Sequence, residues 1–163
     1  MSRISPDTEK GEDMNRFMKA AIREAYRGIE SGEGGPFGAV IVKDGKIVAR
    51  GHNQVLKNKD ATCHGEVQAI RRASKKLGTH DLSGCEIYTT GEPCPMCLGA
   101  IMWANIERVF YGCNIADTED IGFRDKKFYE KTDEEHAAFV TECEREACLK
   151  LYADYKNMEH GEY

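Results

Sequence analysis

Two short stretches hold the side chains in this sequence that are best suited to bind a metal ion. His64 and Glu66 lie two positions apart, and Cys94 and Cys97 lie three positions apart directly after Pro93. One imidazole and two thiolates form a nitrogen and sulfur donor set that suits Zn²⁺. Three protein ligands leave the fourth tetrahedral position to water, which is typical of a catalytic zinc site. Glu66 would then be a free carboxylate beside that water, able to accept and return protons.

Each of these residues also has a plainer interpretation. The two cysteines alone could form a redox pair or half of a structural zinc site. A redox pair leaves His64 and Glu66 without a role, and a structural site needs a fourth ligand, for which Cys63 and Cys113 are the candidates. Glu66 could also simply stabilise a helix N-terminus by about 0.3–1 kcal/mol. The complete set of four residues favours the catalytic zinc site.

The remaining cysteines and histidines are expected to have structural or surface roles. The chain has seven cysteines, an odd number that disfavours a disulfide scaffold. We expect four of them to be small buried apolar residues, namely Cys63, Cys85, Cys143 and Cys148. We expect four histidines to lie on the surface or in loops, namely His52, His80, His136 and His160.

The composition is that of one globular domain. The 163 residues are 40% hydrophobic and 31% charged, which is enough for one core. We expect residues 1–12 to be a disordered leader and residues 13–163 to form the domain. No apolar run approaches the roughly 20 residues of a membrane span, and the polar start lacks the apolar segment of a signal peptide. The default expectation is a cytoplasmic protein.

The charge balance bears on possible partners. The formal net charge is −5, which argues against a dedicated nucleic-acid surface because phosphate binding relies on clustered Lys and Arg. Arg71, Arg72, Lys75 and Lys76 form a small basic cluster, which is more typical of a solvated helix face. A small-molecule partner is therefore favoured.

The candidate metal ligands and Glu66 are expected at the starts of two helices, in a chain where helices alternate with strands. Apolar spacing predicts a first helix that Asp13 caps and that ends at Gly32 or Gly34. Two β-rich runs, 37–43 and 46–51, flank Asp44-Gly45, a strong hairpin signal. Further helices are predicted at 64–77 and 94–104, and further strands at 86–90 and 108–112. This alternation indicates an α/β sheet with helices on both faces.

The other segments carry weaker signals. Residues 54–62 and 114–127 are predicted to be polar loops. From Thr132 onward the chain is predicted to be mostly helical, beginning with a capping box between Thr132 and Glu135. A short strand near Phe139 and Val140 is an alternative that the pattern leaves open.

With these motifs the chain resembles the cytidine-deaminase-like superfamily of zinc-dependent deaminases. His-x-Glu followed by Pro-Cys-x-x-Cys is the signature of zinc nucleobase deaminases, and the resemblance covers about residues 17–129. Within the superfamily the chain most resembles the bacterial guanine deaminases. That closer similarity rests on residues 34–40, 92–101 and 122–125, and on the terminal Glu162-Tyr163.

The resemblance implies a fold and an activity. The fold would be a three-layer αβα sandwich with a mixed five-stranded sheet, in a homodimer whose C-terminal segment crosses to the partner. Each subunit would hold one Zn²⁺ through His64, Cys94 and Cys97, with Glu66 moving protons. The reaction would be hydrolytic deamination of a free purine base, guanine to xanthine plus ammonia.

The resemblance also implies contacts with the base. Phe37 would stack on it, Asn53 would bond its edge and the Gly65 N–H would face it. Asp125 would hold the ring, and Tyr163 would close the pocket of its own subunit or of the partner. The sequence departs from the family at Gly65, usually Ala, at Gly91, usually a residue with a side chain, and across residues 132–159.

Three other functions fit parts of the same pattern. A tRNA adenosine deaminase shares the zinc motif, and it acts on a base that has been flipped out of the stack into the active-site pocket. A cytosine or nucleoside deaminase would differ only in its pocket. A zinc-stabilised interaction module without catalysis would hold its metal through four protein ligands and would unfold on chelation.

Overall fold

A mixed β-sheet lies at the centre of the computed structural model, which describes residues 15–163. The expectations for residues 1–12 and for Asp13 as a helix cap lie outside the described residues. The strand order is β2-β1-β3-β4. β1 is antiparallel to both β2 and β3, whereas β3 and β4 are parallel. The bounds are β1 Gly38–Lys43, β2 Lys46–His52, β3 Cys85–Gly91 and β4 Arg108–Cys113.

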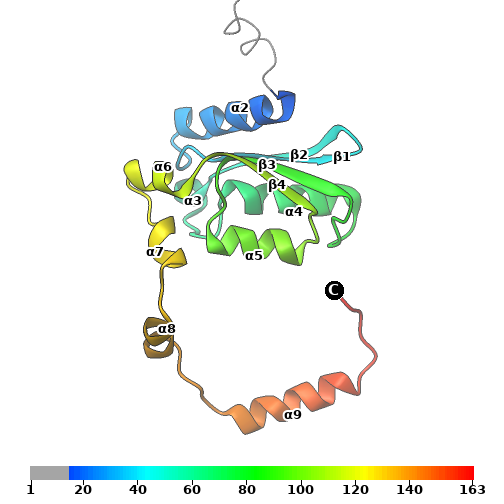
Figure 1. Cartoon of the computed structure of the whole chain (residues 1–163). Helices are drawn as coiled ribbons and strands as arrows, with labels where there is room; N and C mark the ends of the chain where they lie inside the picture. The colour runs from blue at the N-terminus through cyan, green and yellow to red at the C-terminus, as the bar shows by residue number, and fades with distance from the viewer. Residues whose placement is uncertain (1–14) are drawn as a thin grey trace, which may run out of the picture.

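Helices cover both faces of this sheet (Figure 1). Helix α2 (Arg16–Glu30) packs on one face, and α4 (Gly65–Leu77) and α5 (Pro95–Trp103) lie on the other. A buried hydrophobic cluster contains residues of α2 together with residues of β1 and β3 that face this helix, among them Val40 and Tyr88. A larger cluster around Ile41, Ile87 and Ile101 fills the opposite side. The expected three-layer αβα arrangement is therefore confirmed.

Local chemistry fixes the ends of the first elements. The Asn15 side chain accepts hydrogen bonds from the backbone N–H groups of Phe17 and Met18, which makes Asn15 the N-cap of α2. Gly32, one residue beyond the C-cap, has a φ of +65°, which glycine adopts at little cost. Asp44 and Gly45 both have positive φ in the hairpin turn, as a type I′ turn requires.

The expected fifth strand is absent from the described residues. The sheet has four strands, and the candidate at Phe139 and Val140 is instead the end of helix α8 (Asp133–Phe139). The reason is local: a capping box between Thr132 and Glu135 starts a helix that runs to Phe139. The expectation of five strands in this chain is therefore wrong, and within residues 15–163 no strand pairs with the outer edge of β4.

Two segments predicted as loops contain short helices. Helix α3 (Val55–Asn58) interrupts the first, and α6 (Ile115–Asp120) and α7 (Asp125–Tyr129) occupy most of the second. A capping box between Asn114 and Asp117 begins α6. Asn followed three residues later by Asp is a recognisable start signal, so this helix could have been predicted from the sequence.

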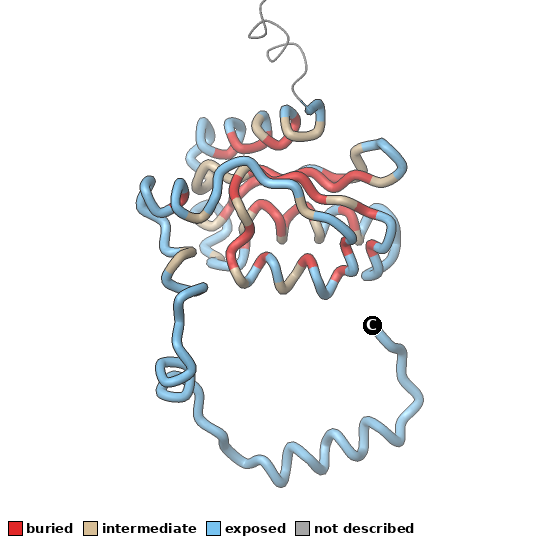
Figure 2. Tube along the Cα trace, in the orientation of Figure 1, coloured by how far each residue is buried: buried red, intermediate tan, exposed pale blue. Residues whose placement is uncertain are grey.

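Residues 130–163, termed here the C-terminal arm, lie apart from the sheet and its helices except at Tyr163, whose ring is near Trp103 and His80. The arm contains α8 and α9 (Arg145–Lys156) and is exposed along its whole length (Figures 1 and 2). Its predicted helices and the Thr132 capping box are confirmed. Cys143 and Cys148 are exposed there, so their expected burial is wrong, whereas Cys63 and Cys85 are buried as expected.

No helix among residues 15–163 combines the length and the apolar character that crossing a bilayer requires.

Candidate active site

The candidate site lies at one edge of the sheet, where several chain segments end or begin. Because β1 is antiparallel to β2 and β3, the start of β1 meets the ends of β2 and β3 at this edge. Phe37 directly precedes β1, and Asn53 directly follows β2. The N-termini of α4 and α5 open onto the same edge, which brings the residues of four distant segments together.

The three predicted metal donors converge at the two helix N-termini. His64 is the N-cap of α4 and Cys94 is the N-cap of α5, and neither side chain caps its helix. The His64 Nδ1 atom lies 3.6 Å from Cys94 Sγ and 3.4 Å from Cys97 Sγ. All three donor atoms lie within 4.8 Å of one another. This spacing lets one ion contact all three.

The charges of these donors match a divalent cation. The pKa of Cys94 is lowered to about 4, mainly by hydrogen bonding with the Cys97 thiol and further by His64. Hydrogen bonding with Cys94 raises the pKa of the Cys97 thiol and also that of His64. Cys94 is therefore a thiolate near neutral pH, whereas His64 and Cys97 hold protons that a bound cation would displace.

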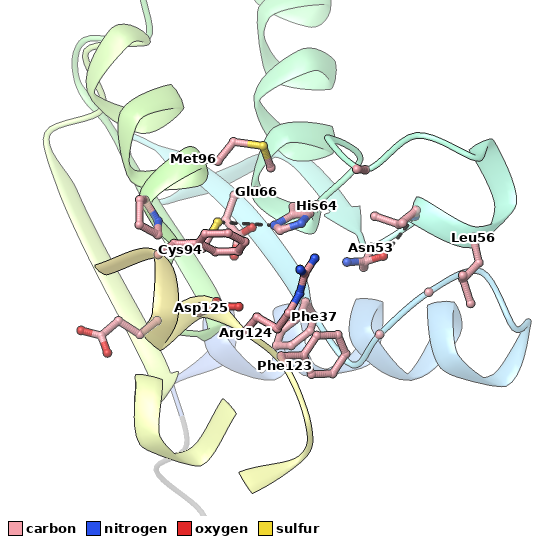
Figure 3. A pocket seen from close by; sticks show the side chains of 17 residues that line it. Phe37, Asn53, Leu56, His64, Glu66, Cys94, Met96, Phe123, Arg124 and Asp125 are labelled. Atoms are coloured by element: carbon pink, nitrogen blue, oxygen red, sulfur yellow. Dashed lines mark hydrogen bonds between the residues drawn. The ribbon is translucent and has the colours of Figure 1, made fainter. Parts of the chain in front are cut away.

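Glu66 lies next to the donors without belonging to them. It is in the first turn of α4 and is only 5% exposed. Burial raises the pKa of its carboxyl group. It lines the same cavity as His64 and Cys94 (Figure 3), so its carboxyl group can reach a molecule bound there.

A cavity of about 750 Å³ opens beside the metal donors (Figure 3). Four of the predicted substrate-binding and catalytic residues line it: Phe37, Asn53, Glu66 and Asp125. Its size lies within the range of small-molecule sites. The structure therefore brings these four residues together with His64 and Cys94 around one cavity.

A comparison with protein families identifies this arrangement. The model of the cytidine and deoxycytidylate deaminase zinc-binding region matches residues 11–113, which include all three donors and Glu66. The chain belongs to this deaminase family. The chain is accordingly a zinc-dependent aminohydrolase, and His64, Cys94 and Cys97 form a group that could hold its zinc ion.

Relatives of this chain include a guanine deaminase and a tRNA-specific adenosine deaminase. The guanine deaminase of Bacillus subtilis is 51% identical over 117 residues, 72% of this chain and 75% of that protein. Its crystal structure superposes with a TM-score of 0.84 at 42% identity, covering 92% of this chain and 99% of that one. A tRNA-specific adenosine deaminase from Aquifex aeolicus is 48% identical over 95 residues, 58% of this chain and 62% of that protein.

Glycines shape the wall of the deaminase pocket around Phe37. The Phe37 ring meets Phe123 edge-on, with centroids 4.8 Å apart. A Cβ atom at Gly91 would lie 3.2 Å from the Phe37 ring, and one at Gly65 would lie 2.9 Å from the Phe37 carbonyl oxygen. Both departures from the family pattern thus leave room for Phe37.

Helix α7 carries Asp125 to the pocket. The Tyr129 hydroxyl donates a 2.6 Å hydrogen bond to the Pro93 carbonyl oxygen, which ties α7 to the loop before the zinc-binding cysteines. Asp125 is half-buried, and burial raises its pKa. A carboxylate held this way can accept N–H groups of a bound heterocycle.

Two pocket residues beside Asp125 are not predicted from the sequence as site residues. Phe123 packs on Phe37, and the Arg124 guanidinium points into the cavity toward the side that holds Asn53 (Figure 3). Arg124 is the cation among the described residues that line this cavity. The signal that could have indicated them is the Gly-Phe-Arg-Asp stretch at 122–125, which places an aromatic ring, a cation and a carboxylate in succession.

Tyr163 lies outside the pocket of its own chain. It is 81% exposed at the end of the arm, and its ring lies 5.9 Å from that of Trp103 and 6.1 Å from that of His80. Within one chain, therefore, the predicted role of Tyr163 has no geometric support.

Proposed function

We propose that this deaminase hydrolyses the amino group of free guanine, giving xanthine and ammonia. The observation that carries the proposal is the similarity to the B. subtilis guanine deaminase, which extends over 99% of the length of that crystal structure at a TM-score of 0.84. The pocket polar groups Asn53, Arg124 and Asp125 add a chemical argument, because they can pair with both the donors and the acceptors of a purine.

In this proposal Glu66 moves the protons. A zinc ion held by His64, Cys94 and Cys97 would supply acidity, since bound zinc can lower the pKa of water to about 7. The Glu66 carboxylate accepts the proton that the attacking water loses at C2 of guanine. It then returns protons to the ring nitrogen and to the departing ammonia. Its burial keeps bulk water from competing for these protons.

The pocket wall would orient the base. The Phe37 ring offers a face for stacking, and Asp125 accepts N–H groups of the ring. The Asn53 Oδ1 atom accepts a 3.1 Å bond from the Val55 N–H, which leaves the amide N–H group of Asn53 free to meet an acceptor on the base. A site whose polar groups pair with one edge of a particular base rejects other bases strongly. When another base binds, buried polar groups of the site are left without hydrogen-bond partners.

Deamination of adenosine in tRNA is the competing function, since the Aquifex enzyme shares 48% identity with this chain. Against it, the arm contains both acidic and basic residues and the chain carries a net charge of −5. Salt-sensitive binding to tRNA, together with inosine formation, would favour this alternative.

Ammonia release from a panel of substrates tests the proposal. We expect guanine to be turned over, and guanosine, adenine, cytosine, cytidine and tRNA to give at most a small fraction of that rate. A Glu66→Gln variant should bind zinc at the wild-type ratio but lose about 10²–10⁴-fold in kcat. Turnover of guanine at the wild-type rate by that variant would refute the role of Glu66.

We further propose that two chains exchange their C-terminal arms in a homodimer. The arm exposes apolar side chains, among them Phe139, Leu151 and Tyr152. The rest of the chain exposes Trp103 on α5, and an apolar groove of about 320 Å³ lies between α2 and the end of β4. A second copy would cover these surfaces and could bring its Tyr163 to the pocket. Residues 13–163 would then form one domain with an exchanged arm.

A further inference from the structure

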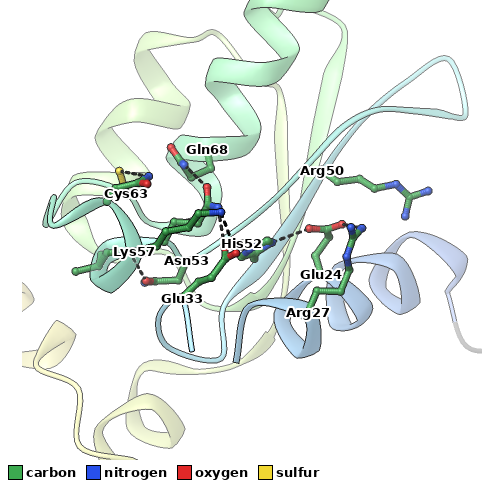
Figure 4. A network of polar contacts seen from close by, with 12 residues as sticks. Glu24, Arg27, Glu33, Arg50, His52, Asn53, Lys57, Cys63 and Gln68 are labelled. Carbon is green, nitrogen blue, oxygen red and sulfur yellow. Dashed lines mark hydrogen bonds and ion pairs between the residues drawn. The ribbon is translucent and has the colours of Figure 1, made fainter. Parts of the chain in front are cut away.

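A buried histidine outside the zinc site lies between two carboxylates. His52 ends β2, and its side chain is 11% exposed, which corrects the prediction of a surface or loop histidine. The Nδ1 atom lies 2.9 Å from Glu24 Oε2, and the Nε2 atom lies 2.6 Å from Glu33 Oε2 (Figure 4). Carboxylates only accept hydrogen bonds, so both contacts are satisfied when both ring nitrogens carry a proton.

The Glu33 carboxylate joins further groups to this contact. It accepts hydrogen bonds from Gln54 Nε2 at 2.7 Å and from Lys57 Nζ at 3.0 Å. These bonds, with that of His52 first, lower the pKa of Glu33 to about 2. Gln54 in turn accepts a 2.6 Å bond from Gln68 on α4. The network thus links α2, the turn after it, the end of β2 and the helix that carries Glu66.

Asn53 lies inside this network without belonging to it. Both of its neighbours in sequence, His52 and Gln54, bond to the Glu33 carboxylate. The Asn53 backbone N–H donates to the Phe37 carbonyl oxygen at 2.9 Å. A Cβ atom at Gly34, the residue after Glu33, would lie only 2.1 Å from Asn53 Oδ1. Any shift of the turn at Glu33 would therefore move the Asn53 side chain.

We propose that His52 is a positioning residue, which through Glu24 and Glu33 fixes the turn that holds the Asn53 amide against the pocket. The inference rests on the proposed function and adds to it a determinant of base affinity outside the residues that line the cavity. Without the imidazole, two carboxylates would face each other without their shared donor. The turn would relax, and the amide would no longer be held in the orientation that meets the base.

A double-mutant cycle on the zinc-loaded, full-length protein tests this role. His52→Gln keeps one amide donor but cannot bond both carboxylates. We expect KM for guanine to rise about five- to tenfold, which corresponds to the loss of one well-placed hydrogen bond. We expect kcat and the zinc content to stay nearly unchanged. In an Asn53→Ala background the same substitution should leave KM unchanged, because the group through which His52 acts is gone.

Two further variants separate positioning from stability. Val42→Ala lowers stability through a buried β1 residue outside the network, and it should leave KM unchanged. Glu24→Gln keeps a hydrogen-bond partner for Nδ1 and should fold even if His52→Gln does not. Like His52→Gln, it should raise KM for guanine, and only when Asn53 is present.

An NMR readout does not depend on turnover. In the free protein, the side-chain amide signals of Asn53 should broaden or shift in His52→Gln or Glu24→Gln, and stay unchanged in Val42→Ala. An equal rise in KM with and without Asn53, or unchanged Asn53 signals, would overturn the inference. Failure of the proposed function would look different: the wild-type protein would not deaminate guanine, and the cycle would then be measured on the base that it does accept.

Discussion

Single side chains decide which base the pocket accepts, and Asp125 is the clearest case. Its carboxylate offers only acceptors, whereas an amide would present an N–H group toward the N–H groups of guanine. We expect Asp125→Asn to lower kcat/KM for guanine about 10- to 100-fold, the cost of an unpaired buried group. Steady-state kinetics measure this. Asp120→Asn, an exposed change on α6, is the control and should match the wild type.

Arg124 makes a second prediction at the residue scale. Its guanidinium lines the cavity, and Met keeps much of its length but none of its donors. We expect Arg124→Met to raise KM for guanine about tenfold, the effect of one lost bond to an acceptor on the base. Lys127→Met removes a charge from α7, which Arg124 precedes as N-cap, at a position outside the pocket lining, and it should change KM little. An unaltered KM for Arg124→Met would exclude Arg124 from base binding.

At the scale of elements, the turn between α2 and β1 depends on the charge of Glu33. The pKa of Glu33 is lowered from 4.5 to about 2 in the folded protein, so its contribution to stability is complete above about pH 4.5 and disappears as the pH falls to about 2. We expect Glu33→Gln to lower the free energy of unfolding at pH 7, with the difference from wild type shrinking between pH 4.5 and 2. Urea unfolding at several pH values measures it, and a constant difference would contradict the role of the charge.

At the scale of the whole molecule, mixing two inactive variants tests the exchanged arm. One chain carries Glu66→Gln and the other carries Tyr163→Ala. If Tyr163 acts in the partner's pocket, the mixed dimer has one intact site, and co-expression in equal amounts should restore about a quarter of wild-type activity. If Tyr163 acts in its own chain, the mixture will be no more active than its components. Light scattering on the same samples gives the oligomeric state.

Short sequence patterns are enough to predict the candidate chemistry and most of the local structure. His64, Glu66, Cys94 and Cys97 are readable because each pair lies within one helical turn, so its geometry follows from short spacing. The Asp44-Gly45 hairpin and the Thr132 capping box were equally local. These features depend on the conformations of a few adjacent residues, which the residue types specify.

Contacts between segments that are far apart in sequence could be predicted only from the folded chain. His52 is buried because α2, the following turn and β2 meet around it, and no pattern near residue 52 encodes Glu24 and Glu33 as its partners. Phe37 and Asp125 share a pocket because an antiparallel pair and α7 meet at one edge of the sheet. The expected fifth strand failed because it would have to pair with β4, whereas the arm leaves the sheet and its last residue returns beside α5 instead. Packing over long separations in sequence is a property of the whole fold, and short patterns do not contain it.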